Sequence, residues 1–379
     1  MAREFADFLD RVRVGMESAG GDEIASARIF LSELNRFLYQ GVGVSEPDLV
    51  SAFHGWWRDH ADQVLNFCVN EVQCLAVARI LDPVFRDPDG FPGLEIHPPV
   101  SRKGVSAKIV ANVRFFTAIQ DFKIDIYKKG RNPFLKALQA PAWFDPRRVA
   151  EDDKLVGEFL EFIEATGSQG DKRRGWMTAA AQFLVEEHAG SAWNLGPDLA
   201  FDAARIREEL ASRGNLGYSE KKATIFLRDM ADWGVWPGLS NTEVLNVASD
   251  QNTMRIALRT GILHPAIPLL ASYLDVYCYQ YGLTDRMTQL AWRKVWEQWA
   301  NVAGNARPAG PASVDYVLYK SVGKAFCKKG HPKCANCLFD SVCPDECRKL
   351  QPPKSISREG QTGWKSGRTD AGGGGGIMS

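Results

Sequence analysis

Four cysteines near the C-terminus have the types and spacing that point most directly to chemistry. The sequence holds eight cysteines, and four of them form a C-x6-C-x2-C-x5-C pattern: Cys327, Cys334, Cys337 and Cys343. Thiolates crowded into seventeen residues either bind metal or become oxidised. Zinc sites usually use two short C-x-x-C-like knuckles separated by a longer stretch, and here there is one knuckle. The pattern therefore favours a 4Fe-4S cluster, with zinc and disulfides as the alternatives.

Two upstream segments carry further candidate residues. Residues 215–223 read N-L-G-Y-S-E-K-K-A and precede an apolar-periodic stretch, and residues 250–255 read D-Q-N-T-M-R. Together with the cysteine spacing, they resemble the endonuclease III-like helix-hairpin-helix DNA glycosylases, whose motifs are L-P-G-V-G-x-K-T-A and D-x-[HN]-x-x-R. The resemblance covers roughly residues 105–345. It departs from the hairpin motif at Leu216 and Ser219, where the family has proline and glycine.

The resemblance implies a role for each matching residue. Lys221 falls on the family's nucleophile, and a register shifted by one residue would select Lys222 instead. A neutral lysine amine attacks the sugar and forms a Schiff base, after which β-elimination nicks the strand. Desolvation in a cleft would lower the pKa of such a lysine and expose the free amine. Asp250 matches the carboxylate that stabilises the sugar cation, although an aspartate here is also an ordinary helix N-cap.

The same resemblance predicts the contacts with DNA. Gly217 and Ser219 would bring hairpin N–H groups to a phosphate, and Gln120 would fill the space left by a base turned out of the stack. The basic loop between the first two cysteines would touch the DNA backbone through three lysines: Lys328, Lys329 and Lys333. Since four thiolates leave no open position on a 4Fe-4S cluster, the cluster is expected to hold this loop in place.

The distribution of charge fits a polyanionic partner, although the 379-residue chain has no net charge. Residues 1–100 hold sixteen acidic and eight basic residues and no lysine, a formal charge of −8. Residues 101–148 hold eleven basic and three acidic residues, giving +8, and residues 320–379 hold eleven and five, giving +6. Two cationic surfaces for double-stranded DNA are therefore expected, beside one acidic region.

Apolar periodicity predicts an all-α fold, because the periodic stretches have the helical repeat of 3.6 residues and none alternates convincingly as a strand. The predicted helices span residues 24–39, 46–57, 61–81, 108–120, 153–164, 177–188, 200–212, 221–233, 252–260, 268–281 and 285–301. Five prolines in residues 82–100 predict a break. Cys68, Cys74 and Cys278 lie in apolar, helix-like contexts and are predicted to be buried.

The resemblance divides the helices into two lobes. Residues 105–245 would form a helical barrel with the hairpin, called here the hairpin lobe. Residues 246–350 would carry Asp250 and the cysteines, and are called the cysteine lobe. Residues 1–95 form a helical region without a family counterpart, whose role and protein partner stay open. Residues 351–379 are rich in glycine and serine and are predicted to be disordered.

The sequence also gives expectations about location and assembly. No apolar run reaches the ~18 residues that span a bilayer, and the N-terminus lacks the apolar segment of a signal peptide. We therefore expect a cytoplasmic, nucleoid-associated protein that does not enter membranes. A monomer is expected.

Three functions compete on this basis. The leading hypothesis is a DNA base-excision glycosylase with AP lyase activity, acting on a damaged, mismatched or modified base whose identity the sequence does not give. The alternative is a non-catalytic iron-sulfur protein that binds DNA or senses damage on the same fold, which the irregular hairpin and the acidic N-terminal region favour. A third reading is an iron-sulfur redox protein without a nucleic-acid partner, against which the cationic segments argue.

Overall fold

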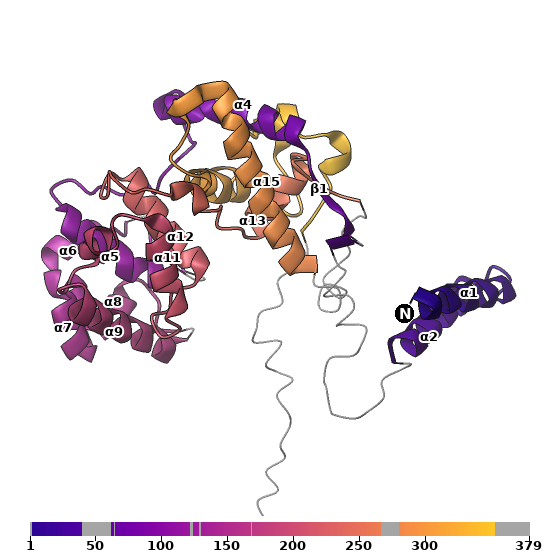
Figure 1. The fold of residues 1–379 in the computed structure, drawn as a ribbon, viewed down its shortest axis with the longest axis horizontal. Coiled ribbons are helices and arrows are strands. Elements are labelled where there is room, and N and C mark those ends of the chain that lie inside the picture. The colour runs from indigo at the N-terminus through magenta and orange to yellow at the C-terminus, as the bar shows by residue number, and fades with distance from the viewer. Residues whose placement is uncertain are drawn as a thin grey trace, which may run out of the picture. The chain divides into compact units, whose positions relative to one another are not determined.

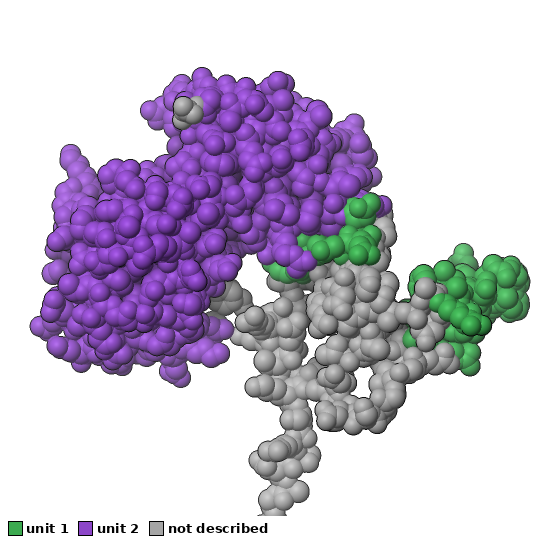
Figure 2. All heavy atoms as spheres, viewed as in Figure 1, with its two compact units in different colours: residues 1–66, 270–283, 353–379 green, residues 67–269, 284–352 purple. Residues whose placement is uncertain are grey.

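The computed structural model describes residues 2–39, 62–63, 65–121, 124–128, 130–167, 169–266 and 280–352. The chain divides into two compact units, one of residues 1–66, 270–283 and 353–379 and the other of residues 67–269 and 284–352 (Figure 2). The predicted helix 46–57, most of the predicted helix 268–281, Cys278 and the tail after Pro352 lie outside the described residues. The predicted N-terminal region 1–95 is thus divided between the two units.

Residues 2–39 of the first unit form a pair of helices, α1 (Ala2–Ser18) and α2 (Glu23–Tyr39). Phe8 packs between them and is stacked on Phe37, with ring centroids 5.0 Å apart. Arg11 on α1 donates to Glu33 on α2 at 2.7 Å. These contacts make α1 and α2 a self-contained helical hairpin.

The hairpin lobe of the second unit is built around one apolar core. Its helical elements are α5 (Ala107–Gln120), α6 (Pro133–Gln139), η2 (Pro141–Phe144), α7 (Pro146–Glu151), α8 (Asp153–Phe162), α9 (Gly170–Glu187), η3 (Ala192–Asn194), α10 (Leu195–Asp198), α11 (Ala203–Ser212), α12 (Glu220–Asp232) and η4 (Thr242–Val244). Figure 1 shows α5, α6, α8, α9 and α11 gathered in one group. Residues 113–120 of α5 are all buried, so this helix is central to the lobe.

The cysteine lobe has a second apolar core. Its elements are α4 (Glu71–Arg86), η1 (Pro88–Gly90), α13 (Gln251–Arg259), α15 (Gln280–Ala303) from Thr284 onward, η5 (Gly304–Ala306), η6 (Pro311–Val314), the π-helix η7 (Val317–Lys324), η8 (Cys334–Asn336), η9 (Asp340–Val342) and η10 (Asp345–Cys347). Trp292 and Trp299 of α15 are fully buried in this core. The helix α4 packs into it through Cys74, Val77 and Leu81, so residues before 95 also build this lobe.

The described chain confirms the all-α prediction, with one correction. Strands β1 (Phe67–Val69) and β2 (Leu263–Pro265) form an antiparallel pair, in which Cys68 lies opposite His264. The predicted helix 61–81 is therefore wrong in its first half, because Asn66 adopts a φ of +42° and Asn70 caps a new helix. That helix, α4, continues past Pro83 to Arg86, beyond the predicted break at residue 82.

The strand also changes the environment of a cysteine. Cys68 is exposed, which corrects the prediction that it is buried, whereas Cys74 on α4 is fully buried as predicted. None of the helices in the described ranges is long and apolar enough to cross a membrane.

Candidate functional site

The segment between α11 and α12 is a short, tightly packed connection. Gly217 adopts a φ of +70°, and a β-carbon there would lie 2.6 Å from the Trp176 ring, so both the backbone and the packing require glycine. Tyr218 is buried and donates from its hydroxyl to the Phe115 carbonyl at 2.9 Å. Ser219 has a φ of −122° and caps α12 by accepting from the Lys222 N–H. Its backbone is extended, so serine fits without strain where the resembled hairpin has glycine.

A cleft of about 760 Å³ opens between the two lobes of the second unit. The hairpin lobe contributes Lys221 and Lys222, and the cysteine lobe contributes Asp250 and Asp315. The amine of Lys221 donates to the carbonyl of Ser249 at 2.7 Å, one residue before Asp250. The fold therefore brings the two predicted catalytic residues, which are 29 positions apart in the sequence, into one cleft.

The carboxylate of Asp250 is held by the start of α13. Its Oδ1 accepts from the N–H groups of Asn252 at 2.7 Å and Thr253 at 2.9 Å, and the Thr253 hydroxyl accepts from the Asp250 N–H at 2.7 Å. This is a capping box, so the helix-cap role foreseen for Asp250 is present. A carboxylate fixed by backbone donors is well suited to supply a stationary negative charge.

Lys222 lies beside Lys221 but points its amine into the hairpin lobe. The amine donates to the carbonyls of Ile119 at 2.6 Å and Gly217 at 2.9 Å, and it lies 4.9 Å from the centre of the Trp176 ring. Desolvation, together with the charge of Arg173, lowers the pKa of Lys222 to about 8. The desolvation expected of a catalytic lysine is thus found at Lys222, although its amine is committed to two carbonyls.

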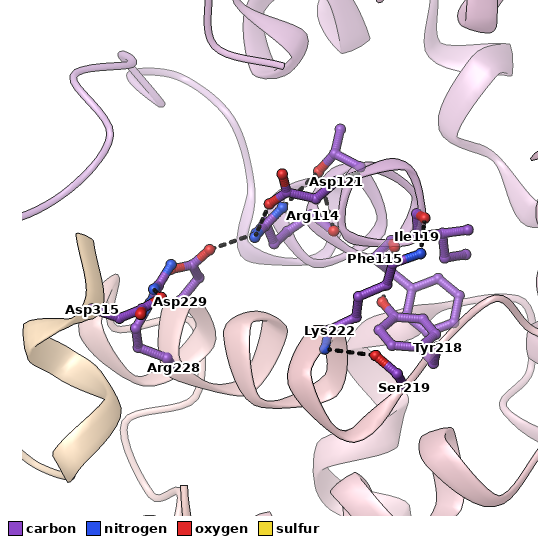
Figure 3. A network of polar contacts seen from close by, with 11 residues as sticks. Arg114, Phe115, Ile119, Asp121, Tyr218, Ser219, Lys222, Arg228, Asp229 and Asp315 are labelled. Carbon is purple, nitrogen blue, oxygen red and sulfur yellow. Dashed lines mark hydrogen bonds and ion pairs between the residues drawn. The ribbon is translucent and has the colours of Figure 1, made fainter. Parts of the chain in front are cut away.

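Buried charged side chains that line the cleft form a network (Figure 3). Asp229 accepts from Arg114 of α5 at 2.5 Å and from Arg228 of α12 at 2.6 Å. Arg228 also donates to Asp315, which lies between η6 and η7, at 2.8 Å. Burial raises the pKa of Asp315 to about 6. The network joins the two lobes, because Arg228 belongs to one and Asp315 to the other.

The four predicted metal ligands lie around one small pocket. Cys327, Cys334, Cys337 and Cys343 all line it, and their sulfurs are free of disulfides. Burial first, and then the neighbouring cysteines, raise the pKa of Cys343 to about 12. Within the described residues, no three His, Cys, Asp or Glu side chains converge closely enough to hold a single metal ion. Cys347 is buried and is not part of the lining.

Helix α13 connects the cleft to the cysteines through hydrogen bonds. The Asn252 amide donates to Asp250 Oδ2 at 3.1 Å, and its Oδ1 accepts from Arg255 at 2.6 Å. Arg255 Nε then donates to the Cys327 carbonyl at 2.6 Å. One turn later, Arg259 lies 3.5 Å from the Cys327 sulfur and donates to the Lys328 carbonyl at 3.0 Å. The same helix therefore positions Asp250 and the first cysteine.

The lysines of the loop after Cys327 are exposed to solvent, while hydrogen bonds fix the backbone of the loop. Lys328, Lys329 and Lys333 are exposed. The Lys329 carbonyl accepts from Gln351 at 2.7 Å, although Gln351 is the first residue of the predicted disordered tail. The Lys333 N–H donates to the Phe326 carbonyl at 2.9 Å. The three ammonium groups are therefore free to meet a polyanion on a fixed backbone.

Gln120 does not lie where a DNA-inserting side chain must lie. It is fully buried at the end of α5, and its side-chain Oε1 and backbone carbonyl accept from Arg173 at 3.2 and 2.8 Å. This placement corrects the predicted role of Gln120, because a residue that fills a gap in DNA has to protrude from the protein.

The sequence missed the buried charges of the site. Asp315 lies in the apolar run P-A-S-V-D-Y-V-L-Y. A single carboxylate in such a run indicates a buried charged side chain, which is rare unless it is paired. Arg259 follows Arg255 by four residues and so shares its helix face. The pairing of Arg114 with Asp229, 115 positions apart, had no local signal.

Comparison with protein families finds none that matches the chain, and comparison with curated proteins finds no similar protein.

Proposed function

We propose that this protein is a DNA N-glycosylase with AP lyase activity, similar to the endonuclease III-like helix-hairpin-helix enzymes. One observation carries the proposal: Lys221 and Asp250 line the same cleft, with the Lys221 amine bound to the residue before Asp250. A nucleophilic amine beside a fixed carboxylate is the pair that displacement of a base from a sugar requires. The substrate is a damaged, mismatched or modified base in double-stranded DNA.

Each residue of the pair has a distinct task in the proposed reaction. The Lys221 amine forms a bond to the sugar carbon as the bond to the base breaks, and the base leaves with the electron pair. Positive charge on the sugar is stabilised by the Asp250 carboxylate, which the start of α13 holds still through two N–H groups. The bound amine then loses a proton, and its electron pair forms the carbon–nitrogen double bond while the bond from that carbon to the ring oxygen breaks. The ring oxygen takes up a proton, which gives the Schiff base, and β-elimination then breaks the strand.

Lys221 is the better of the two lysines for this task. Among the described residues, its amine donates to one acceptor, the carbonyl of Ser249, the residue before Asp250. The Lys222 amine has two acceptors, both in the hairpin lobe, and a ring beside it. Moving Lys222 to a sugar would break two hydrogen bonds, whereas moving Lys221 would break one.

The four cysteines fit a 4Fe-4S cluster, which when bound would tie the loop of Lys328, Lys329 and Lys333 to α13. All four sulfurs face one pocket, which supports a shared ligand. Arg255 and Arg259 hold the loop from the other side.

Cations on the cysteine lobe and N–H groups on the hairpin lobe support the DNA partner. Lys320 and Lys324 of η7 line the cleft opposite the hairpin lobe, and Lys328, Lys329 and Lys333 follow on the exposed loop. The N-terminus of α12, capped by Ser219, adds N–H groups that favour a phosphate. A strand lying along these groups would pass over the cleft mouth.

Borohydride trapping on a duplex with one abasic site tests the proposal. The wild-type protein is expected to form a covalent complex under borohydride and to nick the strand without it. A nicking screen over duplexes with oxidised pyrimidines, 8-oxoguanine, mismatches and hypermodified bases then identifies the base. Tight binding to the abasic duplex without trapping or nicking would favour the non-catalytic DNA-binding alternative.

A further inference from the structure

Asp315 is a buried carboxylate that the proposed reaction has not yet used. It is 6% exposed and lines the cleft. Its Oδ2 accepts from Arg228 at 2.8 Å, whereas its Oδ1 has no hydrogen-bond partner within the described part of the chain. A buried oxygen without a partner is costly, and in a cleft it marks a place where a ligand group binds.

The surroundings of Asp315 place it among the proposed catalytic residues. Its protonation responds to Arg228, Lys221 and Asp229 on α12 and to Asp250 at the start of α13. The η7 helix begins two residues later, and Tyr316, Tyr319 and Lys320 line the same cleft as Asp315. Asp315 therefore shares an electrostatic environment with both Lys221 and Asp250.

Asp250 and Asp315 are suited to different tasks. Asp250 uses Oδ1 for two backbone N–H groups and Oδ2 for the Asn252 amide, so its oxygens are occupied. Asp315 has one oxygen fixed by Arg228, and its buried Oδ1 has no hydrogen-bond partner among the described residues. Two carboxylates whose environments differ in this way commonly divide electrostatic stabilisation and proton transfer between them.

We propose that Asp315 is the proton acceptor of the β-elimination step, an inference that rests on the proposed lyase function. After Lys221 has formed the Schiff base, Asp315 Oδ1 takes the proton from the sugar carbon next to the imine carbon. The electron pair of that C–H bond forms a carbon–carbon double bond, and the imine π electrons move to nitrogen. When the electron pair on nitrogen forms the carbon–nitrogen double bond again, the electrons of the carbon–carbon double bond shift toward the carbon that bears the 3′ phosphate. The C–O bond to the phosphate then breaks, and the phosphate leaves with its electron pair. Asp315 then releases the proton to water.

The charge state of Asp315 suits this step. Burial raises its pKa to about 6, while the charge of Arg228 opposes that rise. Near neutral pH the carboxylate is therefore mostly ionised, yet it is more basic than an ordinary aspartate. Proton transfer is most effective when the pKa of the acceptor lies near the working pH.

The test compares trapping with nicking on the same abasic duplex, which needs no knowledge of the excised base. Asp315→Asn keeps the side-chain volume but cannot accept the proton. It should trap with borohydride within about threefold of wild type and nick about 10²-fold more slowly. In the wild type, the nicking rate per trapped complex should rise with pH through about 6, and Asp315→Asn should lose that rise.

Asp232→Asn is the matched control. The side chain of Asp232, the last residue of α12, is 9% exposed, and desolvation raises its pKa to about 6 while the charge of Arg228 opposes that rise, but it does not line the cleft. It accepts from Ser313 at 3.0 Å. This variant should trap and nick like wild type, because it has no access to the sugar.

The outcomes separate this inference from the function it rests on. If Asp315→Asn nicks as fast as wild type, or loses trapping and nicking equally, Asp315 is not the proton acceptor. Equal loss would mean that the carboxylate only supports Lys221 or the fold. If the wild-type protein neither traps nor nicks, the lyase function fails first and this inference with it. Trapping also shows that each variant is folded.

Discussion

The Lys221 amine donates to the Ser249 carbonyl at 2.7 Å, so a lysine of the hairpin lobe is bound next to the aspartate that opens α13 in the cysteine lobe. This bond and the Arg228–Asp315 ion pair both cross between the lobes. The positions of the catalytic residues therefore depend on how the two lobes pack. A substitution that alters the packing of either lobe should change the geometry of the cleft.

Lys221→Ala should abolish borohydride trapping while duplex binding stays within a few-fold of wild type. The amine makes the covalent bond but contributes little to the grip on phosphates. Covalent complexes are counted on denaturing gels, and binding is measured by anisotropy. Lys222→Ala is the paired variant, and a trapping defect in it alone would assign the nucleophile to Lys222.

Asp250→Asn should slow single-turnover base excision by roughly 10² to 10⁴ on the substrate found by the nicking screen. Asparagine caps helices as well as aspartate, so thermal stability should hardly change. Asp250→Ala also removes the cap and should cost about 1 kcal/mol of stability. Normal excision by Asp250→Asn would show that the carboxylate serves only as the cap of α13.

Replacing Lys328, Lys329 or Lys333 by alanine should weaken the salt dependence of DNA binding. Each substitution should reduce the magnitude of the slope of log association constant against log salt concentration by about one, without changing base preference. These side chains are exposed on a loop whose backbone is fixed by Arg259 and Gln351. Lys154→Ala is the control, since its side chain is 81% exposed on α8, away from the cleft lining. An altered base preference with an unchanged slope would mean that the loop reads bases.

Purified protein should be brown, and Cys334→Ser should lose the visible absorbance together with solubility. Removal of one thiolate leaves the cluster short of a ligand, and α13 loses the loop that it holds. Cys68→Ser should keep the colour, because Cys68 is exposed on β1 and lies outside the four-cysteine pocket. A colourless protein with one equivalent of zinc would contradict the cluster.

Lys222 should make stability depend on pH in the alkaline range. Its pKa falls from an ordinary 10.5 to about 8 on folding, chiefly by desolvation. Between these values the unfolded chain holds more protons than the folded one, so the stability of the wild type rises with pH. Lys222→Met should remove a rise on the order of 2 kcal/mol, measured by urea unfolding across that window. The exposed-site variant Lys154→Met should keep the wild-type rise.

The sequence determined the helical class and the order of the candidate residues, because helical periodicity and ligand spacing are local properties of the chain. Ligands that are two to six residues apart need little beyond their own loop to meet, and the four cysteines do face one pocket. An aspartate that opens a helix can likewise be recognised locally, and Asp250 does cap α13. Each of these features is written within a short segment.

Tertiary structure decided the rest, since it depends on which segments pack together. Gln120 was predicted to enter the DNA stack, but it is buried and Arg173 from α9 donates to its side chain. Residues 67–69 looked helical, but pairing with residues 263–265 makes them a strand. Whether Lys221 or Lys222 faces Asp250 depended on the rotation of α12 against the cysteine lobe. The environment of Asp315 also came from packing, because burial beside Arg228 leaves its Oδ1 without a hydrogen-bond partner among the described residues.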